Sequence, residues 1–128
     1  MIVVDTSALL AILFAEPAAR ACRDVLAVER EISISAGTLS EALILAAHRN
    51  ALEEMSALVE DLGIAIEPLD AARARRVALA HKRWGKGVHP AGLNFGDCFA
   101  YSLAKEMDCP LLFLGEDFSR TDVKTVLG

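Results

Sequence analysis

The chain has 128 residues, of which 54% are hydrophobic and 24% charged, and its formal net charge is −5 at pH 7. This length and composition suit one globular domain with a sizeable core, so we expect a single domain over residues 1–128. No apolar run approaches the roughly 18 residues of a membrane span, and the N-terminus lacks the features of a signal peptide. We therefore expect a cytoplasmic protein with no membrane partner. The three cysteines form no CxxC pair, which argues against a disulfide framework and a zinc site.

Short β-branched runs alternate with longer helical patterns along the chain, which is typical of βαβ units around a parallel sheet. Strands are predicted at 2–4, 32–35, 64–66 and 111–114, with a short fifth strand at 123–126. Helices are predicted at 6–14, 17–30, 36–49, 51–62, 70–84 and 94–107. Glycines and prolines separate these elements. The pattern predicts a three-layer α/β/α fold with a central parallel sheet of about four to five strands.

Basic residues are concentrated in one segment of this acidic chain. Between Arg73 and His89 there are six Lys or Arg residues and no acid, whereas the whole chain has 13 basic and 18 acidic residues. The net charge argues against a nucleic-acid partner, but a concentrated basic segment supplies the charges that phosphate contacts need. On charge distribution alone, we select Lys82, Arg83 and Lys86 as candidates for nucleic-acid backbone contacts. The glycine-rich loop at 85–92 is equally consistent with a ligand contact and with a solvated connector.

Three acids lie close to the predicted carboxyl ends of strands. Asp5 ends the first strand, Glu41 falls in the first turns of the helix after the second, and Asp117 follows the fourth by three residues. In a doubly wound sheet, ligands bind beyond the carboxyl ends of the strands. We therefore expect these three side chains near one another, although a helix cap for Asp5 and a turn for Asp117 are adequate structural explanations.

Glu41 fits a purely structural explanation least well. It could complete a capping box that begins at Thr38. However, the following residues at 42–47 are all apolar, which predicts a helix that is buried all round. An unpaired carboxylate in such a helix would be costly.

Asp97 has no recognisable strand before it, so the strand-end rule does not place it with the other acids. It could complete a capping box that begins at Asn94. Three apolar residues follow a helical stripe through this segment, namely Phe95, Phe99 and Leu103. Asp97 lies off that stripe and faces a different side of the helix.

Together, the four acids predict a site for a hard cation. An acidic group with no Cys or His nearby suits Mg²⁺ or Mn²⁺ better than zinc. Carboxylates that hold such an ion support phosphodiester hydrolysis, because the ion activates water and neutralises charge on the scissile phosphate. Thr6 and Ser7 could add hydroxyl and backbone N–H donors to a phosphate oxygen, although both residues equally suit a helix start.

Four parts of the chain, taken in order and spacing, form a specific pattern. They are the opening IVVDTSA at 2–8, Glu41, the segment GLNFGDCFAY at 92–101 and the segment LLFLGEDFSRTD at 111–122. This pattern resembles the VapC family of toxin ribonucleases, which are PIN-domain proteins, and the resemblance covers nearly the whole chain. It implies the PIN fold and a metal-dependent endoribonuclease.

The resemblance also implies roles and partners. It assigns Asp5 and Asp97 as the principal ligands of Mg²⁺ or Mn²⁺ within the quartet Asp5, Glu41, Asp97 and Asp117. Glu116 and Asp122 are close enough in sequence to replace or assist Asp117. The family's usual properties are cleavage of structured RNA, often tRNA, a homodimeric state, and inhibition by an antitoxin protein that covers the acidic site.

Two other classes of function remain as alternatives. A phosphoacceptor signalling domain shares the size, the fold class and an acidic Mg²⁺ pocket, but it requires adjacent early acids, whereas Asp5 stands alone. A catalytically silent binding module, whose acids receive Arg or Lys from a partner, differs from the enzyme only in activity. We predict the metal-dependent endoribonuclease, in which Asp5 and Asp97 hold the ion while Glu41 and Asp117 orient the attacking water.

Overall fold

A parallel sheet forms the centre of the molecule, as described by a computed structural model over residues 1–127. Its strands are β1 (Ile2–Val4), β2 (Ile32–Ser35), β3 (Ala65–Glu67) and β4 (Leu111–Leu112). Their order in the sheet is β3-β2-β1-β4, and all neighbours run parallel. In the centre of the sheet, Val3 lies opposite Ser33 of β2 and Leu111 of β4. This arrangement confirms the predicted central parallel sheet.

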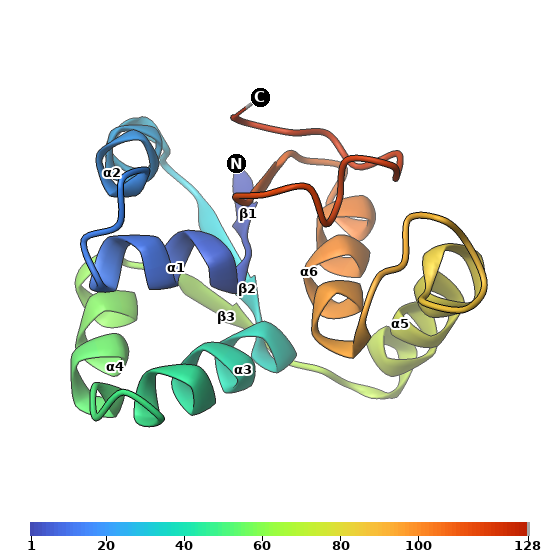
Figure 1. Cartoon of the computed structure of the whole chain (residues 1–128), viewed down its shortest axis with the longest axis horizontal. Coiled ribbons are helices and arrows are strands. Elements are labelled where there is room, and N and C mark those ends of the chain that lie inside the picture. The colour runs from blue at the N-terminus through green and yellow to red at the C-terminus, as the bar shows by residue number, and fades with distance from the viewer. Residues whose placement is uncertain (128) are drawn as a thin grey trace.

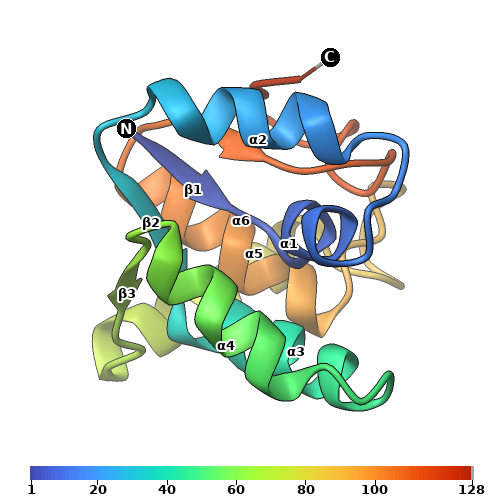
Figure 2. The same ribbon diagram turned by 90° about the vertical axis from the view of Figure 1, so that its left-hand side faces the viewer.

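Helices cover both faces of the sheet (Figure 1). In the described residues they are α1 (Thr6–Leu13), α2 (Ala19–Val28), α3 (Ala36–Ala47), α4 (Leu52–Asp61), α5 (Ala71–Trp84) and α6 (Phe95–Glu106). Helices α1 to α4 form the layer that faces the viewer in Figure 2, and α5 and α6 form the opposite layer. Two hydrophobic cores lie on the two faces of the sheet, one under α1 to α4 and the other under α5 and α6. Because side chains alternate along a strand, Ile2 and Val4 point into the first core and Val3 into the second. The predicted three-layer α/β/α fold is therefore confirmed.

The predicted fifth strand at 123–126 is wrong. Within residues 1–127, this segment meets the sheet at a single parallel bridge between Leu111 and Thr125, where the Leu111 N–H donates to the Lys124 carbonyl at 2.8 Å. Strand β4 is also shorter than predicted. It ends at Leu112 because the N–H of Leu114 donates to a side chain of α1 instead of a neighbouring strand.

The prediction that α3 is buried all round is also wrong. Ile44 is 56% exposed and Leu45 is 37% exposed. The buried stripe consists of Thr38, Ala42 and Ala46, which recur every four residues on one side of the helix. Within residues 1–127, no helix has both the length and the apolar character needed to cross a bilayer.

Candidate active site at the carboxyl edge of the sheet

Asp5 follows β1 directly and is the N-cap of α1, with only 5% of its surface exposed. Its Oδ2 accepts hydrogen bonds from the Ser7 backbone N at 3.1 Å and from Ser7 Oγ at 2.6 Å. Burial raises the pKa of Asp5, the hydrogen bonds from Ser7 oppose that rise, and the charge of Glu41 adds to it. Asp5 is therefore a helix cap and, at the same time, a buried acid beside a second acid.

Ser7 connects Asp5 to the chain that leaves β4. Its hydroxyl donates to Asp5 and accepts from the backbone N–H of Leu114 at 3.0 Å. This contact joins residues 107 positions apart in the sequence. It brings the segment that continues to Asp117 to the same edge of the sheet as Asp5.

Glu41 projects from α3 toward α1, where its Oε1 accepts a 2.7 Å hydrogen bond from Thr6 Oγ1. The predicted capping box with Thr38 is wrong, because α3 begins earlier and is capped by Ser35, whose side chain accepts from the Gly37 N–H at 3.2 Å. Glu41 is therefore held by a contact between two helices, which no local sequence pattern reveals.

The carboxylate of Glu41 rests against Gly96, in the first turn of α6. A Cβ at position 96 would collide with Oε2 of Glu41 and lie 2.7 Å from its Cδ. The sequence analysis gave Gly96 no role. A glycine inside a helix, where it is destabilising relative to alanine, is the signal that could have identified this close approach.

Asp97 completes the capping box predicted from Asn94. Its N–H donates to Asn94 Oδ1 at 2.8 Å, and its Oδ2 accepts from the Asn94 N–H at 3.0 Å. Its pKa is raised to about 6, mainly by burial. The charges of Asp117, Asp5 and Glu41 act in the same direction, and the hydrogen bond from the Asn94 backbone opposes them. Asp97 is thus within electrostatic range of the other three acids, and we call the four the acidic cluster.

Of the three candidates for the fourth acid, Asp117 has the clearest relation to Asp97. It is among the charges that most raise the pKa of Asp97, and neither Glu116 nor Asp122 is. Asp122 instead accepts a 2.5 Å hydrogen bond from the Tyr101 hydroxyl and pairs with Lys105 at 3.3 Å. These contacts hold Asp122 on the α5 side of α6.

The predicted apolar stripe on α6 fails at its first member. Phe95 is 74% exposed, whereas Phe99 is 8% and Leu103 is 4% exposed. The ring of Phe99 occupies the space against Gly37, where an added Cβ would lie 2.5 Å from that ring. Phe95 meets the edge of Phe99 at a centroid distance of 4.8 Å and otherwise faces solvent, two residues before Asp97.

The donor chemistry of the acidic cluster fits a hard divalent cation. Within residues 1–127, none of its four carboxylates pairs with Lys, Arg or His. Buried like charges need a counter-charge or bound protons, and carboxylate oxygens are what Mg²⁺ and Mn²⁺ prefer. In the same described residues, no three acidic, His or Cys side chains stand close enough together to hold a metal ion. The residue types therefore fit the ion, while the carboxylates stand apart.

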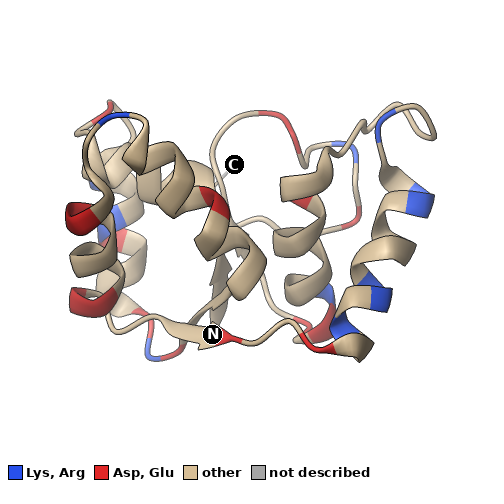
Figure 3. Cartoon of the chain, turned by 90° about the horizontal axis from the view of Figure 1, so that it is seen from below, with Lys and Arg blue, Asp and Glu red and all other residues tan. Residues whose placement is uncertain are grey.

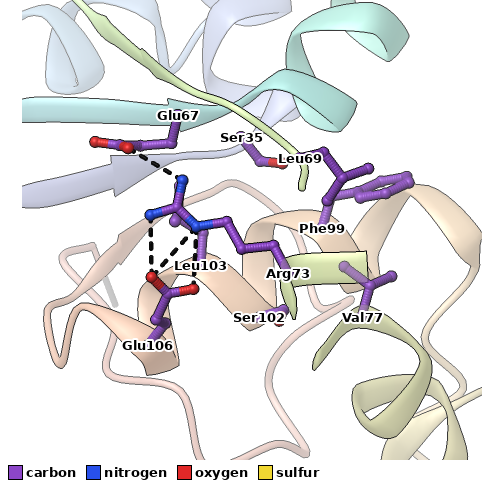
Figure 4. A pocket seen from close by; sticks show the side chains of 9 residues that line it. All are labelled: Ser35, Glu67, Leu69, Arg73, Val77, Phe99, Ser102, Leu103 and Glu106. Carbon is purple, nitrogen blue, oxygen red and sulfur yellow. Dashed lines mark hydrogen bonds and ion pairs between the residues drawn. The ribbon is translucent and has the colours of Figure 1, made fainter. Parts of the chain in front are cut away.

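Two basic residues of the 73–89 segment point toward acids. Arg73 pairs with Glu67 of β3 at 3.1 Å and with Glu106 of α6 at 3.0 Å, as Figure 4 shows. Arg76 lies 3.8 Å from Glu106. The cavity beside Arg73, drawn in Figure 4, measures about 10 Å³, which is room for about one water molecule. Arg73 is therefore a structural clamp of α5 on the sheet and α6.

The three predicted nucleic-acid contacts lie at the other end of this segment. Lys82, Arg83 and Lys86 are exposed, and the guanidinium of Arg83 lies 4.8 Å above the ring centre of Trp84. Figure 3 shows Lys and Arg along α5, whereas acids are spread over the other elements. The hydroxyls of Thr6 and Ser7, predicted to face a phosphate, donate instead to Glu41 and Asp5.

Comparisons of sequence agree with this geometry. The PIN domain family model matches residues 2–124. Ribonuclease VapC of Mycolicibacterium smegmatis is 41% identical over 127 residues, which cover 97% of this chain and 98% of that protein. Ribonuclease VapC30 of Mycobacterium tuberculosis is 42% identical over 134 residues, with 97% of each chain covered.

Solved structures share the fold. Mycobacterium tuberculosis VapC20, described as a toxin that cleaves the sarcin-ricin loop, matches with a TM-score of 0.80 and 19% identity over 98% of both chains. A toxin-antitoxin complex from Klebsiella pneumoniae matches with a TM-score of 0.70 and 18% identity over 95% of this chain and 93% of that one. At such identities the likeness concerns the fold alone, whereas the sequence relatives identify the family. The chain therefore belongs to the PIN domain family and, within it, to the VapC ribonucleases.

Proposed function

We propose that this chain is the toxin of a toxin–antitoxin pair, and that it hydrolyses phosphodiester bonds of structured RNA with the help of Mg²⁺ or Mn²⁺. The expected substrate is tRNA. The names of the relatives that match nearly the full length support ribonuclease activity. The observation that carries the metal dependence is the pair Asp5 and Asp97, two acids with raised pKa values and no cationic partner in residues 1–127.

In this proposal, Asp5, the N-cap of α1, and Asp97, in the first turn of α6, would hold the ion, because they carry the raised pKa values of the cluster. When bound, the ion supplies charge neutralisation at the scissile phosphate and lowers the pKa of a bound water. Glu41 and Asp117 orient the attacking water by accepting its hydrogens. In-line attack then leaves a 5′-phosphate and a 3′-hydroxyl.

Thr6 and Ser7 act as positioning residues in this scheme. Each hydroxyl donates a hydrogen bond to a carboxylate of the acidic cluster, Thr6 to Glu41 and Ser7 to Asp5. Such hydrogen bonds fix the direction of a ligand side chain, and their loss typically weakens metal binding or activity. The Ser7 backbone N–H also donates to Asp5, so a phosphate contact by this pair would compete with these bonds. Lys82, Arg83 and Lys86 remain the proposed contacts to the RNA backbone.

Two protein partners complete the proposal. An antitoxin covers the acidic cluster, in keeping with the description of the Klebsiella pneumoniae structure as a toxin-antitoxin complex. The second partner is another copy of this chain in a homodimer. Mixing the chain with its antitoxin should stop RNA cleavage, and light scattering should give twice the monomer mass.

The decisive experiment uses the purified chain without its antitoxin. Total RNA is incubated with Mg²⁺ or Mn²⁺ or with EDTA, and the cut ends are mapped by sequencing. We expect cleavage that EDTA and Asp97→Asn both abolish. Cleavage that continues under either condition contradicts the metal mechanism, and RNA that is bound but never cut identifies a silent binding module.

The fourth acid is tested in the same assay with a matched pair of neighbours. Both Asp117 and Glu116 are exposed, so neither change should disturb the fold. We expect Asp117→Asn to lose most of the activity and Glu116→Gln to retain it. The reverse pattern would transfer the role to Glu116.

A further inference from the structure

A groove of about 290 Å³ runs between α5 and α6, on the side of α6 that Asp122 contacts. Its lining includes Arg76, Arg83 and Trp84 of α5 and Tyr101, Lys105 and Glu106 of α6. Three of these side chains are cationic and one is anionic. Asp122 pairs with Lys105 and adds a second negative charge. The groove still has a net positive charge, whereas the whole chain has a net charge of −5.

We propose that this groove binds the phosphate backbone of the RNA substrate at a point remote from the acidic cluster. The proposal rests on the proposed ribonuclease function, because the substrate is then a polyanion longer than the cluster itself. A net negative enzyme needs a local positive surface to hold such a substrate, since phosphate contacts draw on Lys and Arg. The groove supplies that surface.

Arg83 is the best placed cation in the groove. Its guanidinium lies over Trp84 at 4.8 Å from the ring centre, and it forms no ion pair within residues 1–127. A guanidinium held over an aromatic ring keeps its N–H groups for other partners, which suits two-point contact with a phosphate. Arg76 lies two helical turns earlier on the same side of α5 and also lines the groove.

Two aromatic rings line the groove, and their polar groups are already paired. Trp84 Nε1 donates to the Tyr101 hydroxyl at 2.8 Å, and that hydroxyl donates to Asp122 at 2.5 Å. Because these polar groups satisfy one another, Trp84 and Tyr101 offer ring surface to a ligand rather than hydrogen bonds. A cationic rim above aromatic surface suits a sugar-phosphate chain, because phosphates meet the rim and a sugar or base meets the rings.

The groove also lies in line with the acidic cluster. Asp97, Tyr101 and Lys105 recur every four residues along α6, so they occupy neighbouring turns of one side of the helix. At 1.5 Å per residue, Lys105 lies roughly 12 Å along the axis from Asp97. An RNA strand cut at Asp97 therefore reaches the groove within a few nucleotides, whereas a very short oligonucleotide does not.

The test compares two substrates and one matched pair of changes. The groove variant is Arg76→Ala with Arg83→Ala, and Arg83→Gln alone is the milder version. The control is Arg75→Ala, which removes one positive charge, as Arg83→Gln does, from an exposed residue of the same helix outside the groove. Total tRNA and a short single-stranded oligoribonucleotide are cleaved in parallel.

We expect the groove variant to raise KM for tRNA by about tenfold with kcat nearly unchanged, because a remote contact contributes binding alone. The salt slope of tRNA binding should fall by roughly 2, one for each lost phosphate contact. Cleavage of the short oligoribonucleotide should fall far less, because that substrate does not reach the groove. Equal effects of Arg75→Ala, equal losses on both substrates, or no effect on tRNA would each overturn the proposal.

Binding measurements keep this test separate from the proposed activity. Fluorescence anisotropy with tRNA is measured in an Asp97→Asn background, so the groove is tested even if the chain cuts neither RNA. A chain that binds tRNA through the groove without cutting it contradicts the ribonuclease and supports the groove. Unchanged tRNA binding with a lost protein interaction would assign the groove to a protein partner instead and overturn the proposal.

Discussion

Replacing Gly96 by alanine tests whether the placement of Glu41 depends on a missing side chain in α6. The added Cβ would collide with Oε2 of Glu41, so the carboxylate must leave and give up its 2.7 Å hydrogen bond from Thr6. A hydrogen bond to a charged group contributes about 1.5–3 kcal/mol, and the lower end applies because the freed carboxylate reaches water. Alanine returns at most about 1 kcal/mol of helix propensity. We therefore expect unfolding in urea to show a loss of about 1 kcal/mol or less.

Activity should respond more strongly than stability to Gly96→Ala. In the proposed mechanism Glu41 orients the attacking water. Loss of a supporting group beside a metal site costs about 10–100-fold in activity, so we expect a fall in RNA cleavage of that size. The assay is the cleavage rate as a function of Mg²⁺ concentration. High Mg²⁺ should recover little of the loss, because Asp5 and Asp97, which hold the ion in the proposed mechanism, are unchanged.

A double-mutant cycle with Glu41→Ala shows whether Gly96 acts through that carboxylate. If it does, Gly96→Ala costs nothing further once the carboxylate is gone, and the two losses are not additive. Additive losses, or a Gly96→Ala variant as active as the unchanged chain, refute the reasoning. The first result would mean that Gly96 serves a contact other than Glu41.

Three further changes test the electrostatics. Because the folded pKa of Asp97 is about 6 against an ordinary 3.8, its favourable contribution is complete below pH 3.8 and is lost as pH rises through 6. The free energy of unfolding in EDTA, relative to Asp97→Asn, should therefore fall over that window, and Mg²⁺ should reduce the fall. Ser7→Ala should cost about 1–3 kcal/mol in urea by orphaning a backbone N–H, and it should move the acid limb of the pH–rate profile upward by raising the pKa of Asp5. Arg73→Ala should cost about 1–2 kcal/mol in urea, whereas Arg75→Ala should cost almost nothing.

Each of these results has an opposite that would contradict it. A free-energy difference from Asp97→Asn that stays constant from about pH 4 to about pH 7 would show that the pKa of Asp97 is not raised in the folded protein. Ser40→Ala is the control for Ser7→Ala, since the Ser40 hydroxyl donates only within its own helix, to the Ala36 carbonyl at 2.9 Å. Equal losses of unfolding free energy for the two serine variants would show that the hydrogen bond between Ser7 and Leu114 does not stabilise the fold.

Capping motifs built from neighbouring residues could be predicted from the sequence, whereas contacts between distant segments could not. The Asn94–Asp97 capping box spans three residues, and the structure contains it as predicted. The box expected between Thr38 and Glu41 has the same spacing but is wrong, because Ser35 caps the helix first and Glu41 meets another helix. Sequence spacing cannot distinguish these two cases, because Ser35, which caps the helix in place of Thr38, lies outside the motif.

The same distinction explains the errors in the strands. Runs of β-branched residues correctly predict β1 and β2, because both lie at the centre of the sheet and are buried on both faces. The run at 111–114 predicts four residues of strand and the structure has two. The remainder is diverted by the hydrogen bond between Leu114 and Ser7, whose partners are 107 residues apart.

The helix-cap and metal-ligand interpretations of Asp5 and Asp97 are compatible. Each cap uses Oδ2, through Ser7 for Asp5 and through Asn94 for Asp97, so Oδ1 is the oxygen that these bonds leave for a cation. A cap also fixes the rotamer of its side chain, which holds a ligand in place before the ion arrives. Asparagine can accept the same backbone hydrogen bond, so Asp97→Asn should keep the cap and fold at pH 7 with unchanged or higher stability while losing Mg²⁺-dependent stabilisation. A variant that unfolds instead would show that the charge of Asp97 serves the helix rather than the ion.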